Sequence, residues 1–228
     1  MSRLLAIETA TEACSAALYL DGQVLERFQV APRRHAELLL PMLDALLAEA
    51  GLDVRALDAI AFGRGPGAFT GVRIAAAAAQ GIALGAGLPV VPVSTLAALA
   101  QGGLDATSLA AVAAAIDARM GEVYWCCYRR GEDGLAEPLQ DECVIAPEQV
   151  PVPADLPPCA GVGSGFAAHG EALARRLGER LRATDPQTLP HAAAVARLAA
   201  AALARGETVP PAEALPVYLR DQVIQHPR

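Results

Sequence analysis

The chain has 228 residues, 54% hydrophobic and 19% charged, so it is long and apolar enough to bury one large core or two smaller ones. All 18 basic residues are arginines, which excludes P-loop and Schiff-base chemistry because both need a lysine amine. The net charge of −7 argues against a protein that binds nucleic acid alone, since phosphate binding needs clustered cations.

Cysteine usage and the amino terminus predict where the protein works. The five cysteines are odd in number and lack C-x-x-C spacing, which fits the reduced thiols of the cytoplasm. The first apolar run ends at Glu8 and is too short for a signal peptide. The longest apolar stretches are shorter than the roughly 20 residues that span a bilayer. We therefore expect a cytoplasmic protein that does not enter a membrane.

A three-stranded meander opens the chain. Apolar or alternating segments at 4–7, 13–20 and 23–30 predict strands, and Asp21-Gly22 predicts a tight hairpin turn between the last two. The pattern returns 109 positions later, where Ala115-Ile116-Asp117 matches Ala6-Ile7-Glu8. The sequence therefore predicts an internal duplication.

Each meander is followed by an apolar strand, a glycine-rich turn and a helix, at 59–71 and at 158–170. Two such units predict an α/β fold with two related RNase H-like lobes, as in the actin and Hsp70 ATPases. We place the lobes at 1–104 and 105–228, with a boundary in 101–108.

Further elements are expected between and after these units. The spacing of apolar residues predicts helices over 36–50, 72–86 and 95–100, a strand at 89–93, a loop at 147–158 and an irregular tail past Pro210. A helix is also predicted over 192–205, and its alanine stripe is expected to pack back on the first lobe.

The segment from Gly63 to Arg73 is the most informative. Its four glycines allow sharp turning, and Thr70 is expected to cap the following helix. Such a turn can bind an anion, or its glycines can serve only close packing, and the sequence supports both interpretations.

The helix over 36–50 has an unusually wide apolar arc. Its seven leucine and methionine side chains span about 200°, twice the roughly 100° stripe of a surface helix. Either the helix is sandwiched within its own lobe, or part of the arc is left for a partner. We favour the second interpretation.

In each lobe, one acidic residue lies at the end of the first predicted strand. Glu8 and Asp117 are placed to hold a magnesium-bound nucleotide, although an acid at a strand end is often only a solvated turn residue. No two of the four histidines have i, i+4 spacing, so no metal site is expected. An independent ATP-dependent kinase or ATPase would use the two acids, whereas a protease would need a metal or nucleophile that the sequence does not show.

Three stretches together resemble the TsaB (YeaZ) family: 6–15, His35 with 39–47, and 65–73 with its G-P-G-x-F-T-G-x-R pattern. The similarity extends through 93–97, 115–124 and 216–220. It implies a non-catalytic scaffold subunit in forming N6-threonylcarbamoyladenosine (t6A) at adenosine 37 of tRNAs that read codons beginning with A. The implied partners are a TsaD-type paralogue and a TsaE-type ATPase, with tRNA contacted through the complex.

The resemblance also implies a surface. Helices matching 36–50 and 72–86 would bind the TsaD-type partner and could form a homodimer instead. The interface residues would be His35, Leu39, Met42, Leu43, Leu46, Arg73 and Ile74. No cofactor is expected to bind tightly, but ATP or ADP with magnesium could sit at the partner interface near Glu8, Gly65, Gly67 and Asp117. The sequence departs from the common family pattern at Glu8 and Ala68, where aspartate and serine are frequent.

Overall fold

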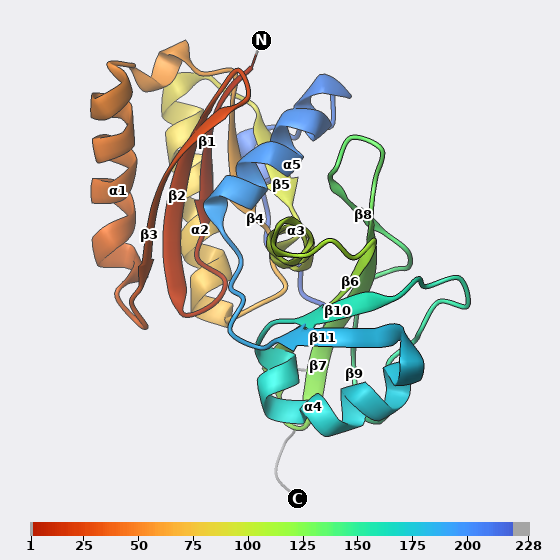
Figure 1. The fold of residues 1–228 in the computed structure, drawn as a ribbon. Coiled ribbons are helices and arrows are strands. Elements are labelled where there is room, and N and C mark those ends of the chain that lie inside the picture. Colours follow the sequence, from red (N-terminus) through yellow and green to blue (C-terminus); the bar gives the residue numbers. More distant parts are fainter. Residues whose placement is uncertain (1, 221–228) are drawn as a thin grey trace, which may run out of the picture.

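Two β-sheets organise the chain in the computed structural model, which describes residues 2–220 (Figure 1). The first sheet has the order β3-β2-β1-β4-β5. Its strands are β1 (Arg3–Glu8), β2 (Ala13–Leu20), β3 (Gln23–Val30), β4 (Ala59–Gly63) and β5 (Val90–Val93). The first three are antiparallel and β4 and β5 run parallel to β1, so the predicted meander is confirmed.

The second sheet repeats this topology. Its strands are β6 (Ala111–Arg119), β7 (Glu122–Arg130), β8 (Ala136–Pro138), β9 (Cys143–Ile145), β10 (Cys159–Val162) and β11 (Leu181–Asp185). The order β11-β10-β6-β7-β8 mirrors that of the first sheet, with β9 added beside β7. An antiparallel meander with two parallel strands beside its first strand thus occurs twice, which confirms the duplicated RNase H-like lobes.

Helices separate and cover the sheets. They are α1 (His35–Ala50), α2 (Phe69–Ala86), α3 (Thr95–Ala106), α4 (Ser164–Leu177) and α5 (Ala192–Ala204), with short 3-10 turns η1 (Val54–Ala56), η2 (Pro147–Gln149), η3 (Gly178–Arg180) and η4 (Pro211–Glu213). α1 and α2 cover the outer face of the first sheet, and α5 covers its inner face. α3 packs on the inner face of the second sheet and α4 on its outer face (Figure 1).

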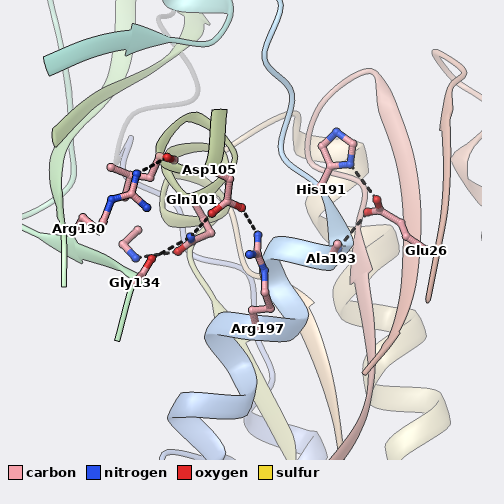
Figure 2. Close-up of polar contacts among 10 residues, drawn as sticks. Glu26, Gln101, Asp105, Arg130, Gly134, His191, Ala193 and Arg197 are labelled. Atoms are coloured by element: carbon pink, nitrogen blue, oxygen red, sulfur yellow. Dashed lines mark hydrogen bonds and ion pairs between the residues drawn. The ribbon is translucent and has the colours of Figure 1, made fainter. Parts of the chain in front are cut away.

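α5 packs back on the first sheet, as its alanine stripe predicts. Ala192, Val195 and Ala199 are buried against residues of β1 and β4, and their small side chains let the helix approach closely. Two hydrogen bonds to residues far away in the sequence hold the start of the helix. The amide of Ala192 donates to Ser15 Oγ at 2.9 Å. The amide of Ala193 donates to Glu26 at 3.0 Å (Figure 2). These bonds satisfy amides that every helix start leaves without an intrahelical acceptor.

α3 is longer than the sequence indicates, since the apolar spacing predicts that it ends at residue 100. The helix continues to Ala106, so a division between 104 and 105 falls inside it. Gln101 is buried and accepts a hydrogen bond from the Ala136 amide at 2.8 Å, which fixes the helix on the second sheet. Gly103 is needed for packing, because a Cβ there would lie 2.8 Å from Val162. Its role is close approach to the sheet and not a helix break.

α2 begins three residues earlier than expected. Ala68 is its N-cap, and Thr70 lies within the first turn, so the predicted capping by Thr70 is wrong. Among residues 2–220, α2 is also the one helix long and apolar enough to cross a membrane by length and composition, contrary to the expectation from shorter runs. Its Ala75, Ala79 and Ala83 are buried on the first sheet, which covers one face of the helix.

Candidate functional site

A cavity of about 1300 Å³ lies between the two lobes. The first lobe lines it with the β1–β2 turn and the starts of α1 and α2, and the second with the end of β6, Tyr124 of β7 and the start of α4. Val217, Tyr218 and Arg220 of the tail complete the lining. The cavity is larger than the roughly 300–1,000 Å³ of an ordinary ligand pocket, so it can admit a ligand of nucleotide size.

The glycine-rich turn between β4 and α2 is packed against the end of β1. A Cβ on Gly67 would lie 2.4 Å from the Ala10 carbonyl oxygen, and one on Gly71 would lie 2.0 Å from that of Thr9. The Ala68 amide donates to Ala10 O at 2.7 Å. The close-packing interpretation of these glycines is therefore confirmed, while anion binding at the turn stays a prediction.

Gly65 connects this turn to the start of α3. Its φ of +96° suits glycine, and its carbonyl accepts a hydrogen bond from the Thr95 amide at 3.0 Å. Gly67 lines the cavity and Gly65 does not. Of the two glycines expected near a nucleotide, only Gly67 is thus placed beside the cavity.

Glu8 is buried and committed to contacts inside the protein. Its carboxylate accepts hydrogen bonds from the Ala10 amide at 2.6 Å and from the Thr95 hydroxyl at 3.0 Å. Burial raises its pKa to about 7, even though these hydrogen bonds oppose the increase. A Cβ on Gly63 would lie 2.0 Å from this carboxylate. Glu8 does not line the cavity, so its place in the structure ties the β1–β2 turn to the start of α3.

Asp117 does line the cavity, from the second lobe. Its carboxylate lies 2.9 Å from the Arg119 guanidinium and accepts a hydrogen bond from the Arg119 amide at 2.9 Å. His169 Nε2 lies 4.0 Å away. The two acids predicted to act together are thus separated, with Asp117 at the cavity and Glu8 in the core. Within residues 2–220, no group of three or more histidine, cysteine or acidic side chains is placed to hold a metal ion.

His35 joins α1 to the cavity. It is 8% exposed, and its Nε2 lies 2.9 Å from the Thr11 carbonyl oxygen in the β1–β2 turn. The helix begins at His35, one residue before the predicted start. His35 therefore positions the turn that forms one wall of the cavity.

The leucines predicted for the partner interface require a correction. Leu39, Leu43 and Leu46 are at most 2% exposed and pack against the first sheet, so they belong to the core and cannot contact a partner in the folded chain. Met42 is half-buried on the flank of the helix, whereas Leu40 is 54% exposed. The wide apolar arc is thus divided: three of its seven side chains are buried on the sheet, three are half-buried, and Leu40 remains on the surface.

The outer face of α2 carries several exposed residues, of which Phe69 and Leu84 were not predicted from the sequence as interface residues. Arg73 is exposed, as expected for an interface residue, and its guanidinium lies 3.2 Å from the centre of the Phe69 ring. Ile74 is half-buried and lines the cavity. Leu84 and Phe69 are 75% and 52% exposed. The sequence contained one indication of these exposed apolar residues: the whole helix has almost no charged residues. A helix that buries only one face normally carries charged residues on the other.

The comparisons with known proteins agree over nearly the whole chain. A family model described as "TsaD: tRNA N6-adenosine threonylcarbamoyltransferase" matches residues 29–225. The tRNA threonylcarbamoyladenosine biosynthesis protein TsaB of Escherichia coli (strain K12) is 44% identical over 225 residues, covering 97% of this chain and 96% of that protein. TsaB of Haemophilus influenzae is 40% identical over 227 residues, covering 96% and 94%.

The solved structures give the same result. The structure described as YeaZ from Pseudomonas aeruginosa superposes with a TM-score of 0.89 at 50% identity, covering 96% of this chain and all of that one. The sequence matches, the duplicated topology and the shared fold agree with one another. The chain therefore belongs to the TsaB (YeaZ) family.

Proposed function

We propose that this chain is a cytoplasmic, non-catalytic subunit that binds a TsaD-type protein during formation of t6A at adenosine 37 of tRNAs that read codons beginning with A. Relatives that match its full length are named as t6A biosynthesis proteins, which supports the pathway. The net charge of −7 supports leaving most tRNA contacts to the partner. A TsaE-type ATPase would act on the assembled complex.

The surface of α2 carries the proposal of partner binding. Its 18 residues have a mean hydropathy of 1.2, yet only 33% of them are buried in the chain. The exposed positions include Phe69, Ala77, Gly81, Leu84 and Gly85. A Cβ on either exposed glycine would meet nothing within 4 Å, so a partner helix can approach the backbone closely. An apolar, nearly uncharged face of this kind is typical of a helix-docking surface.

Leu84→Asp tests this surface by co-purification with the TsaD-type protein of the same organism. A charge placed in an apolar helix interface costs several kcal/mol, so we expect the affinity to fall by about 100-fold or more. Because Leu84 is 75% exposed, the variant should unfold at the wild-type temperature. Val30→Asp, at a residue 54% exposed on β3 and outside the cavity lining, is the matched control and should bind normally.

Unchanged binding by Leu84→Asp would contradict the proposed surface.

A threonylcarbamoyl transfer assay with and without the chain then tests the subunit role. Transfer that depends on both proteins supports it. ATP hydrolysis by the chain alone, without association, would favour the independent ATPase or kinase instead. Sedimentation of the free chain and of Leu84→Asp will show whether the same face forms a homodimer.

A bound nucleotide is the second part of the proposal, with ATP or ADP and magnesium held where the cavity meets the partner. The starts of α2 and α4 line the cavity, and their amides are suited to phosphate oxygens. The fit to the metal is weaker, because Asp117 already pairs with Arg119 and Glu8 is buried. Calorimetry with magnesium ADP, on the free chain and on the complex, would separate a site in the chain from one completed by the partner.

A further inference from the structure

The tail after α5 returns along the first lobe and is fixed there. Val209 pairs with Val90 at the edge of the first sheet through two hydrogen bonds, of 2.9 and 2.8 Å. Ala214 is fully buried in the core beneath α1 and α2, and its carbonyl accepts a hydrogen bond from Gln80 at 3.1 Å. The tail is therefore part of the first lobe up to this point.

Beyond Ala214 the tail crosses to the second lobe. The Val217 amide donates to Arg64 O at 2.8 Å, and the Tyr218 ring lies 6.1 Å from that of Phe69 at the start of α2. Arg220 then reaches the β6–β7 turn, where its guanidinium pairs with Glu122 and lies 3.2 Å from Met120 Sδ. Residues 217, 218 and 220 line the cavity on the way.

The turn that receives Arg220 has an unusual backbone. Arg119, Met120 and Gly121 have φ values of 63°, 56° and 77°, so two residues with side chains occupy the left-handed region. Such conformations persist only where surrounding contacts hold them. Arg220 also lies 3.5 Å from the Arg119 carbonyl, so its guanidinium contacts three successive parts of the turn region.

The lobes are also joined elsewhere, through α3 and α5. Arg197 of α5 pairs with Asp105 of α3, and Gln101 joins α3 to Gly134 at 3.2 Å (Figure 2). Within residues 2–220, no residue of α3 or α5 lines the cavity, whereas the tail does. Glu142 of the second lobe also pairs with Arg64 of the first at 3.5 Å. Of these connections, the helices join the lobes away from the cavity, and the tail joins them beside it.

We propose that residues 214–220 form an interlobe strap, which links α2 to the β6–β7 turn and limits how far the cavity opens. Each end depends on the other because only five residues, outside any helix or strand, separate the buried Ala214 from Arg220. Release of Arg220 frees the β6–β7 turn and loosens the Val217 contact on the first lobe. The strap acts in the free chain and does not depend on a partner.

Hydrogen exchange of the full chain tests the strap with Arg220→Ala. We expect exchange to become about two- to fivefold faster both in 116–124, which contains the turn, and at the Val217 amide, on the other lobe. Arg205→Ala is the matched control, since Arg205 forms its ion pair with Glu207 within the same returning segment, whereas Arg220 pairs with Glu122 at the β6–β7 turn. It should leave both regions unchanged.

Glu122→Gln provides a second variant that removes the same ion pair without shortening a side chain. It should increase exchange in the same two regions, which guards against a folding defect particular to Arg220→Ala. Faster exchange in 116–124 alone would overturn the strap, because the two ends would then be independent. Unchanged exchange in both regions would overturn it as well.

Discussion

At the scale of single residues, Glu8 shows how burial converts an expected ligand into a structural group. Its carboxylate has hydrogen-bond donors from the β1–β2 turn and from α3, but no access to the cavity. Burial disfavours the charged form, so the pKa is raised to about 7 from its ordinary value of 4.5. Glu8 is therefore protonated in much of the folded population at neutral pH.

This shift predicts a pH dependence of stability that Glu8→Gln removes. Because the folded pKa lies above the unfolded one, the stabilisation is complete below pH 4.5 and is lost as pH rises through 7. The free energy of unfolding of Glu8→Gln relative to wild type should therefore increase by roughly 2 kcal/mol between pH 5 and 8. Urea denaturation at both pH values measures this difference.

Glutamine is the suitable replacement because it is neutral and has nearly the same shape as the protonated acid. Glu8→Ala serves as the comparison, since it leaves a cavity and should destabilise the chain at both pH values. If wild type and Glu8→Gln lose stability in parallel between pH 5 and 8, Glu8 is not the titrating group.

At the scale of elements, α1 and α2 separate two kinds of apolar residue that the sequence does not distinguish. In α1, Leu46 is fully buried while Leu40 is 54% exposed, although both belong to one leucine-rich run. A helix rotated by one or two residues would exchange their environments. The face that the sheet covers decides which leucines stabilise the fold and which remain exposed.

Two truncations in α1 check this division. Leu46→Ala should reduce the free energy of unfolding by about 3 kcal/mol, because it removes buried methyl groups and leaves a cavity. Leu40→Ala, on the same helix, should change it by no more than about 0.5 kcal/mol. Urea denaturation of the two variants measures both values, and equal losses would refute the assignment of Leu46 to the core and Leu40 to the surface.

At the scale of the whole molecule, α3 and α5 lie between the sheets and join the lobes. Gln101 is the central group, because its side chain bonds the Ala136 amide, the Gly134 carbonyl and Asp105 (Figure 2). The Arg197–Asp105 pair between the helices is more than a third exposed on both sides. The buried hydrogen bonds of Gln101 are therefore expected to contribute more to the free energy of unfolding than the exposed ion pair does.

Substitution of Gln101 should therefore reduce the free energy of unfolding more than substitution of Arg197. Gln101→Ala leaves a buried amide and a carbonyl without their partner, so we expect a loss of about 2 kcal/mol in the free energy of unfolding. Arg197→Ala should cost less than about 1 kcal/mol, and less still in high salt. Thermal and urea denaturation measure both, and a larger loss for Arg197→Ala would contradict this account.

The sequence by itself determined the features that depend on neighbours along the chain. The Asp21-Gly22 turn and the alternation in 13–20 and 23–30 predict the first meander, and the match of Asp117 to Glu8 reveals its duplicate. The glycine-rich turn at 63–73 and the alanine-rich helices could be predicted for the same reason. These signals are local, so they can be interpreted without knowing what packs against them.

Only the tertiary structure decided which residues form the site. Glu8 is removed from the cavity by a hydrogen bond to Thr95, 87 positions away, and Arg220 reaches Glu122 across 98 positions. The buried face of α1 and the continuation of α3 past Gln101 depend equally on the sheets that they meet. Burial and polar pairing between distant segments have no local pattern, because many partners of similar composition are present in the chain.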